Sequence, residues 1–430
     1  MTVDVVVPVY KHLEFTMQCL RSVLEHGGPA LGRLIIINDA SPEKELMRHL
    51  EGLRRDDGRV RLLVNRVNKG FVHTANLGLS LGEDDVVLLN SDARLTKGAL
   101  DELLGCLHCD VFAAVSPLSN NATLCSVPTF QEASPVKMLE GVPLELGGIP
   151  RATVMPTLNG FCIAFRRKAL ATLGLFDPKF SPGYHEENDW SQRARAAGWK
   201  VARANRAVVL HHGGASFHAA RARLDVVHGR RLVARYPNYL DETEQFARSP
   251  LSGVAARAVR FSMNRLRVRL PVSTMDELER ARFLGNTMVA EAVTETMGEA
   301  CHWAQVPLAA KIAPDVTVVR GVGRWPATSV LVTLIDHTTP LDEVGLPAQL
   351  ALSQGIVTNS EGLATRIRLE LAQPPHRVTV ATKDDHLPFL QLLRKVALSP
   401  DAEILERATR YALEHPDRPD DDLKADASAA

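Results

Sequence analysis

Residues 159–199 read NGFCIAFRRKALATLGLFDPKFSPGYHEENDWSQRARAAGW, and no other part of the chain says more about its architecture. The hydrophobic pattern predicts a strand, a helix, a loop and a second helix. Glu186, Glu187 and Asp189 open this second helix, where the helix dipole stabilises carboxylates. Three acids in four residues exceed what capping needs, so one of them is also a candidate general base for a hydroxyl group.

The segments before this stretch alternate short β-branched runs with helical patterns, which is typical of an α/β fold with a mostly parallel sheet flanked by helices. Strands are predicted at the following positions: 3–9, 34–37, 60–64 and 86–89. Residues 116–156 are rich in proline and show little periodicity, which predicts a long irregular segment of the kind that is often functional.

Polar residues follow several predicted strands, and open α/β sheets bind ligands at the carboxyl ends of their strands. Asp39 could accept hydrogen bonds from a uracil or thymine ring, or it could belong to the start of the next helix. Asp92 ends the triplet Asn90-Ser91-Asp92, which is either a turn or a site for Mg²⁺ or Mn²⁺, since both ions prefer hard oxygen ligands. The predicted strand in VVLHHGGASF (208–217) ends in two histidines, His211 and His212, and a histidine there could complete this metal site.

Several classes of protein are excluded by the sequence. The first strand is followed by neither GxGxxG nor GxxxxGK[ST], which argues against a dehydrogenase and a P-loop enzyme. Lys plus Arg equals Asp plus Glu, at 50 each, so net charge gives no support to a nucleic-acid partner. No apolar run reaches the roughly 18 residues of a membrane span, and the N-terminus does not resemble a signal peptide. Six scattered cysteines suit a reducing compartment, so we expect a cytoplasmic protein.

The motifs taken together resemble the inverting glycosyltransferases of family 2, which have the GT-A fold. The resemblance covers about residues 3–220, roughly half of the chain, and extends to enzymes such as rhamnosyltransferases of O-antigen synthesis. It rests on an ordered series: VVVPVY, INDAS, NKGFVHTANLGL, LLNSD, NGFCIAFRRKAL, GLFDPKF, EENDWSQRARAAGW and LHHGGASF.

This resemblance implies a role for individual residues. The nucleotide would lie against residues of the first four motifs: Pro8, Val9, Tyr10, Asp39, Asn68, Gly70, Asn76 and Ser91. Asp92 matches the metal-binding end of the DxD motif, although Asn90 replaces its first acid, and His211 fits the metal histidine. Glu187 matches the catalytic base, with Asp189 as the acid that follows it. The remaining expected neighbours of donor and acceptor are Asn159, Gly160, Glu186 and Arg193.

The domain organisation predicted from composition has four parts. These are a GT-A domain (1–240), a basic helical linker (241–275), a smaller C-terminal α/β module (276–400), and a helix with a polar tail (401–430). Residues 254–270 carry five arginines among apolar residues, which predicts either a packed linker helix or a basic helix lying on an anionic membrane. The module faintly resembles the first-lobe end of a GT-B glycosyltransferase, and we expect it to have a structural or acceptor-docking role.

The function implied by the resemblance is metal-dependent transfer of a sugar from a UDP-, dTDP- or GDP-sugar to an acceptor hydroxyl. A Mn²⁺ or Mg²⁺ ion would be the cofactor, and a glycan or lipid-linked molecule in bacterial surface polysaccharide synthesis the acceptor. The alternative is a non-catalytic scaffold that keeps the fold, which the incomplete DxD motif would suit. A lipid-linked acceptor would place the protein at the inner face of the membrane.

Overall fold

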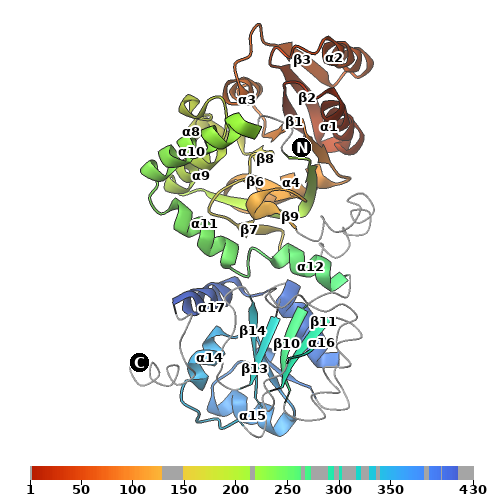
Figure 1. Cartoon of the computed structure of the whole chain (residues 1–430). Helices are drawn as coiled ribbons and strands as arrows, with labels where there is room; N and C mark the ends of the chain where they lie inside the picture. The colour runs from red at the N-terminus through yellow and green to blue at the C-terminus, as the bar shows by residue number, and fades with distance from the viewer. Residues whose placement is uncertain are drawn as a thin grey trace. The chain divides into compact units, whose positions relative to one another are not determined.

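The computed structural model describes residues 2–127, 149–213, 218–262, 267–272, 289–294, 300–302, 316–320, 329–335, 339–381, 387–398 and 400–414. The chain forms two compact units, Met1–Phe246 and Ala247–Ala430. Figure 1 shows that each unit is built around its own sheet with helices packed beside it.

The first unit contains a nine-stranded sheet in the order β3-β2-β1-β4-β8-β6-β9-β5, with β7 paired to β9. Its strands are β1 (Val3–Val9), β2 (Leu31–Asn38), β3 (Val60–Val64), β4 (Val86–Leu89), β5 (Ala93–Leu95), β6 (Phe112–Leu118), β7 (Ala152–Val154), β8 (Cys162–Phe165) and β9 (Lys200–His211). The first four are parallel, whereas β8 runs antiparallel to β4 and β6. The chain switches sides between β1 and β4, and such a switch point is where open α/β sheets bind ligands.

Helices cover both faces of this sheet because successive side chains of a buried strand point to opposite faces. Val5 and Val7 pack in one core with α1 (Leu13–His26), α2 (Lys44–Asp56) and α4 (Ala99–Leu107). Val6 packs in the other core with α3 (Phe71–Leu79), α8 (Arg167–Leu173) and α9 (Glu186–Ala196). That second core also receives Leu232 of α10 (His218–Arg235) and Tyr239 of α11 (Tyr239–Arg248). The predicted strands of this unit and the helix opened by Glu186 are confirmed.

The described residues of the second unit form a seven-stranded sheet in the order β12-β11-β10-β13-β14-β15-β16, and among these strands only the β11–β12 pair is antiparallel. The strands are β10 (Arg267–Val272), β11 (Val289–Thr294), β12 (Ala300–His302), β13 (Val316–Arg320), β14 (Val330–Leu334), β15 (Ile356–Thr358) and β16 (Val378–Val380). Its helices are α12 (Val254–Ser262), α14 (Leu346–Leu352), α15 (Glu361–Glu370), α16 (Leu387–Leu398) and α17 (Ala402–Glu414). It is therefore a second α/β unit, as predicted.

The prediction of one basic helix over 254–270 is wrong. The helix ends at Ser262, and Arg267–Val272 forms β10 between β11 and β13. Pairing with two parallel strands determines this conformation. Arg257 is only 1% exposed, so it does not belong to a solvated basic face. The described residues of this segment, 254–262 and 267–270, therefore do not form the continuous basic helix that was expected to lie on a membrane.

The prediction of irregular structure over 116–156 holds only in part, because β6 extends to Leu118 and β7 occupies Ala152–Val154. Residues 128–148 of this segment lie outside the described part of the chain. Within the described ranges, the helices are all too short or too polar to cross a membrane.

Candidate active site

The carboxyl end of β4 leads into a turn that carries the predicted metal ligand. The backbone N–H of Ala93 donates to the carbonyl of Asn90 at 3.0 Å, which closes the turn around Ser91 and Asp92. Strand β5 then pairs with β9 in a register that sets Ala93 opposite His211. Asp92 Oδ1 lies 3.5 Å from His211 Nε2, and both side chains are 18% exposed. Strand pairing thus brings together the two residues that were predicted to bind a metal.

A loop that follows β6 orients His211. The Nδ1 atom lies 2.7 Å from the carbonyl oxygen of Asn121, which can only accept a hydrogen bond, so Nδ1 carries the hydrogen. The amide of Asn120 donates to the carbonyl of His211 at 3.2 Å and accepts from its N–H at 2.8 Å. Nε2 therefore faces Asp92 and, in the neutral imidazole, carries the lone pair that a metal would bind, an arrangement typical of metal-binding histidines. Neither asparagine was predicted from the sequence.

The donor atoms around this pair suit a divalent cation. Burial favours a raised pKa for Asp92, but the hydrogen bond and charge of a protonated His211, together with a backbone hydrogen bond and the charge of His212, outweigh burial and hold that pKa below its ordinary value. The Oδ1 atom of Asn90 is buried and has no hydrogen-bond partner in the structure. A carboxylate, an imidazole and an amide oxygen can all ligate Mn²⁺. The described residues contain no group of three His, Cys, Asp or Glu side chains at metal-binding distance, so substrate or water would complete the coordination.

Glu187 is connected to the Asp92–His211 pair through two consecutive residues. The backbone N–H of Gly160 hydrogen-bonds the Glu187 carboxylate, and a Cβ at Gly160 would lie 3.3 Å from Glu187 Cδ. Next to it, the ring of Phe161 stacks on the ring of His211 with centroids 5.1 Å apart. The carbonyl of Phe161 accepts the N–H of Asn90 at 2.9 Å. The segment before β8 therefore lies between the candidate base and the candidate metal ligands.

The two glutamates at the start of α9 lie in a desolvated environment. Burial raises the pKa of Glu187, and backbone N–H groups and the charge of His185 only partly offset this effect. Burial, reinforced by the charge of Glu187, raises the pKa of Glu186 well above its ordinary value. Glu186 is 5% exposed, and its Oε2 has no hydrogen-bond partner, like the buried Oδ1 of Asn159. A carboxylate with a raised pKa is a better proton acceptor for a hydroxyl, which suits Glu187 to general-base catalysis.

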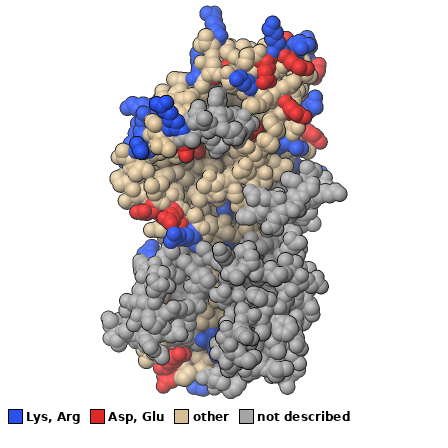
Figure 2. Space-filling model, in the orientation of Figure 1, with Lys and Arg blue, Asp and Glu red and all other residues tan. Residues whose placement is uncertain are grey.

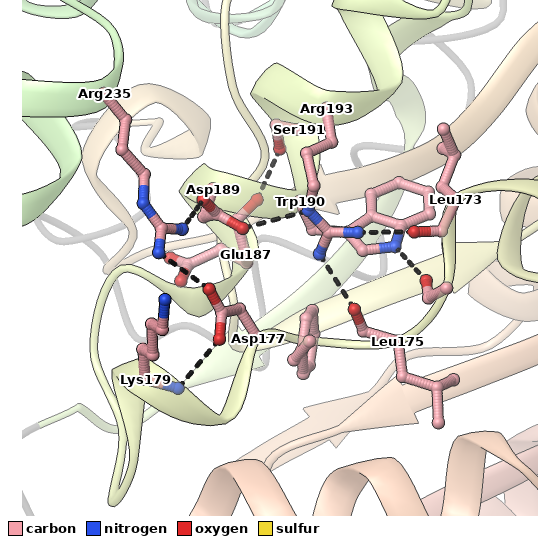
Figure 3. Close-up of polar contacts among 12 residues, drawn as sticks. Leu173, Leu175, Asp177, Lys179, Glu187, Asp189, Trp190, Ser191, Arg193 and Arg235 are labelled. Atoms are coloured by element: carbon pink, nitrogen blue, oxygen red, sulfur yellow. Dashed lines mark hydrogen bonds and ion pairs between the residues drawn. The ribbon is translucent and has the colours of Figure 1, made fainter.

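Asp189 has a different environment, and its predicted catalytic role has to be corrected. Its side chain is fully buried; Oδ2 accepts from Arg193 at 3.0 Å, and Oδ1 accepts from Arg235 at 2.7 Å (Figure 3). Oδ1 also accepts from the Tyr236 hydroxyl at 3.3 Å. Arg193 also donates to the carbonyls of Leu173 and Leu175, so its guanidinium connects α9 to this neighbouring segment and is not free to bind a substrate. Both carboxylate oxygens of Asp189 therefore bind other side chains of the chain, and neither is presented to an acceptor.

Asp39 organises the loop that follows β3. Its Oδ1 accepts from Asn65 Nδ2 at 2.7 Å and from the N–H of Lys69 at 2.9 Å, and its Oδ2 accepts from the N–H of Gly70 at 2.9 Å. Gly70 has φ +81°, and a Cβ there would lie 2.8 Å from Cβ of Pro182. Asn68 is exposed and accepts from the same Gly70 N–H at 3.1 Å. Asp39 does not cap α2, since the helix begins at Lys44 with no side-chain cap.

Three of the predicted nucleotide contacts take part in the fold itself. Both ends of the Asn76 amide bind the backbone of Phe176, at 2.9 and 3.0 Å, so this residue joins α3 to the segment before α9. The Val9 side chain is 1% exposed and lies in the core beside α1, and Pro8 is buried within β1. Tyr10, which follows β1, is half-buried, and Lys11 lies over its ring. Tyr10 is thus the member of this motif whose side chain reaches the sheet edge.

The architecture of the first unit is the GT-A fold, a mostly parallel sheet between helices with its polar cluster at the β1–β4 switch point. The profile of the family described as "Glycosyltransferase like family 2" matches residues 2–225. The chain belongs to this family, and this region is a glycosyltransferase domain. A search of curated proteins found no match.

The solved structures that are similar to this chain include the following three. GalNAc-T7 with UDP, GalNAc and Mn²⁺ is 15% identical with a TM-score of 0.43, and the match covers 58% of this chain and 50% of that one. A mannosyltransferase, PcManGT from Pyrobaculum calidifontis in complex with GDP-Man and Mn²⁺, is 17% identical with a TM-score of 0.43, covering 60% and 74%. S. aureus TarS 1-349 is 12% identical with a TM-score of 0.37, covering 61% and 84%. The chain thus matches half the length of the GalNAc-T7 structure.

Proposed function

We propose that this protein transfers a sugar from a nucleotide-diphosphate donor to an acceptor hydroxyl, with inversion at the anomeric carbon. The observation that carries this proposal is the contact of Gly160 with Glu187 and of Phe161 with His211. These adjacent contacts set a desolvated carboxylate beside an Asp–His pair at the switch point of a family 2 domain.

Glu187 is the base in this proposal. An acceptor hydroxyl is a weak nucleophile near neutral pH, so a carboxylate must accept its proton as the new bond forms. The backbone N–H of Gly160 orients the Glu187 carboxylate, and burial raises its pKa and so its affinity for the proton. Direct displacement of the nucleoside diphosphate by the hydroxyl on the opposite face then inverts the anomeric centre.

Asp92, His211 and Asn90 would hold a divalent cation. When bound, a Mn²⁺ or Mg²⁺ ion supplies positive charge that neutralises the diphosphate leaving group. The chain's own contribution is to fix the ligands: Asn121 sets the hydrogen of His211 on Nδ1, and the Asn90–Ala93 turn sets the position of Asp92. Ser91 lies half-buried within the same turn, beside the expected path of the diphosphate.

The nucleoside would lie at the ends of β1 and β2. Asp39 Oδ2 receives one hydrogen bond from the chain, from Gly70, and a carboxylate oxygen can accept a second from the N–H of a uracil, thymine or guanine ring. Tyr10 offers a half-buried ring beside it. UDP-, dTDP- and GDP-sugars are therefore the donors to test. By resemblance to family 2 enzymes, the acceptor is a glycan or lipid-linked molecule of bacterial surface polysaccharide, and the second unit would take part in docking it.

Three measurements test the proposal. Thermal unfolding with Mn²⁺ and each of UDP, dTDP and GDP should show stabilisation by one nucleotide, since a ligand that binds only the folded state raises its stability. Release of nucleoside diphosphate from the matching sugar nucleotide separates an enzyme from a non-catalytic scaffold. Calorimetry should show that Mn²⁺ tightens nucleotide binding by the native protein and leaves binding by Asp92→Ala unchanged. An equal effect of Mn²⁺ on both proteins contradicts the assignment of Asp92.

A further inference from the structure

One face of α10 contacts the segment 177–189, which contains the candidate base Glu187. Asp225, His228, Arg231 and Arg235 recur at intervals of three and four residues, which places them on the same side of the helix. Each of them contacts a residue between 177 and 189. The opposite side carries exposed residues, among them Arg223 and Arg230, and Figure 2 shows Lys and Arg side chains gathered over α8 and α10.

Arg235 forms ion pairs with two carboxylates, one at each end of the segment 177–189. Its Nη1 donates to Asp189 Oδ1 at 2.7 Å, and its Nη2 donates to Asp177 Oδ2 at 2.8 Å (Figure 3). Asp177 in turn accepts the N–H of Lys179 at 2.9 Å, and the guanidinium of Arg235 lies 5.3 Å from the ring centroid of Phe180. One side chain therefore connects the first turn of α9 to the loop that precedes it.

His228 holds the backbone between these two points. It is 3% exposed, and its Nδ1 lies 2.9 Å from the carbonyl oxygen of Gly183 and 3.2 Å from that of Tyr184. Tyr184 and His185 both have positive φ, at 75° and 69°, which side chains other than glycine seldom adopt. Asp225 lies 3.1 Å from His185 Nε2. Consecutive left-handed residues persist only where their surroundings impose them, and here α10 supplies the contacts.

The position of Glu187 depends on these contacts. Glu187 stands one residue after Glu186, the first residue of α9, and two residues before Asp189, in the same helical turn. A shift of that turn would move the Glu187 carboxylate relative to Gly160. We propose that Arg235 is a positioning residue for sugar transfer, which acts through Asp189 and Asp177 to hold α9 where Glu187 meets the acceptor hydroxyl. The inference rests on the proposed function of Glu187.

The test compares three variants of the full chain. Arg235→Met keeps an aliphatic stem against Phe180 but removes both ion pairs, Arg235→Lys keeps a cation, and Arg230→Met is the control from the exposed side of α10. For each variant, kcat and donor KM are measured for nucleoside diphosphate release from the UDP-, dTDP- or GDP-sugar that the native protein uses. Hydrogen exchange of residues 183–192 is measured in parallel.

We expect Arg235→Met to lower kcat at least about 10-fold with donor KM within about two-fold, because a misplaced catalytic group costs turnover more than binding. Arg235→Lys should recover part of kcat, exchange over 183–192 should rise only in the Arg235 variants, and Arg230→Met should match the native protein. Equal kcat in Arg235→Met and Arg230→Met overturns the proposal, as does a fall of kcat with a matching rise of KM and faster exchange throughout the first unit. If the native protein uses none of the donors, the proposed function fails, and unchanged exchange over 183–192 would reject the positioning role separately.

Discussion

Glu187 and Asp189 lie in the same turn of α9, and their environments predict opposite responses to removal of the charge. Glu187→Gln should lower kcat at least about 10²-fold, the usual scale for loss of a general base. Its stability should be unchanged or slightly increased, because burial already disfavours the ionised form, as the raised pKa of Glu187 indicates. Donor binding should stay close to native.

Asp189→Asn should act first on stability. The substitution leaves two arginines facing a neutral amide in a fully buried position, and removal of one partner from a buried ion pair costs about 3–5 kcal/mol. The lower end of this range applies, because Arg193 still donates to the carbonyls of Leu173 and Leu175 and Arg235 still pairs with Asp177. For a unit of 246 residues, about 3 kcal/mol corresponds to a fall in Tm of roughly 6–12 °C.

The assay combines a thermal melt with the release of nucleoside diphosphate across pH. In the native protein, kcat should fall as pH decreases through the raised pKa of Glu187, that is, at a higher pH than an exposed glutamate would give. Glu187→Gln should have no such decline. Full turnover in Glu187→Gln, or a stable Asp189→Asn protein that has lost turnover, would show that the base has been assigned to the wrong residue.

Two further predictions concern stability. Burial and the charge of Glu187 raise the pKa of Glu186, so the stabilising effect of this residue is present below the ordinary glutamate range and is lost as pH rises through its pKa in the folded protein. Glu186→Gln should therefore raise Tm at pH 8 more than at pH 5. Each tenfold difference in proton affinity between the folded and unfolded states is worth about 1.4 kcal/mol. The same change in Tm at both pH values would contradict this. Gly70→Ala should cost about 2 kcal/mol or more and weaken nucleotide binding, because its left-handed φ and the nearby Cβ of Pro182 both oppose a side chain. Gly58→Ala, with open space around the glycine, is the matched control, and equal melting of the two alanine variants would refute the steric argument.

The sequence alone predicted the strands at 3–9, 34–37, 60–64 and 86–89, the helix that begins at Glu186, and the presence of a second α/β unit. Runs such as 3–9 and 86–89 are buried on both sides, so their apolar composition is visible without knowledge of their partners. The acidic start of α9 is also a local feature, because three carboxylates within one turn mark a helix N-terminus. Asp92, Glu187 and His211 could be proposed from such patterns together with the family resemblance.

Only the tertiary structure decided what each of these side chains contacts. Asp92 meets His211 because β5 pairs with β9, and Asn121 orients the histidine from a loop whose sequence shows no periodicity. Asp189 looks like Glu187 in the sequence, yet its buried carboxylate pairs with Arg235 from α10. Strand partners likewise convert the end of the basic segment into β10. Composition and spacing report which groups are present along a helix or strand, whereas burial, ion pairing and proton affinity depend on neighbours that only the folded chain brings together.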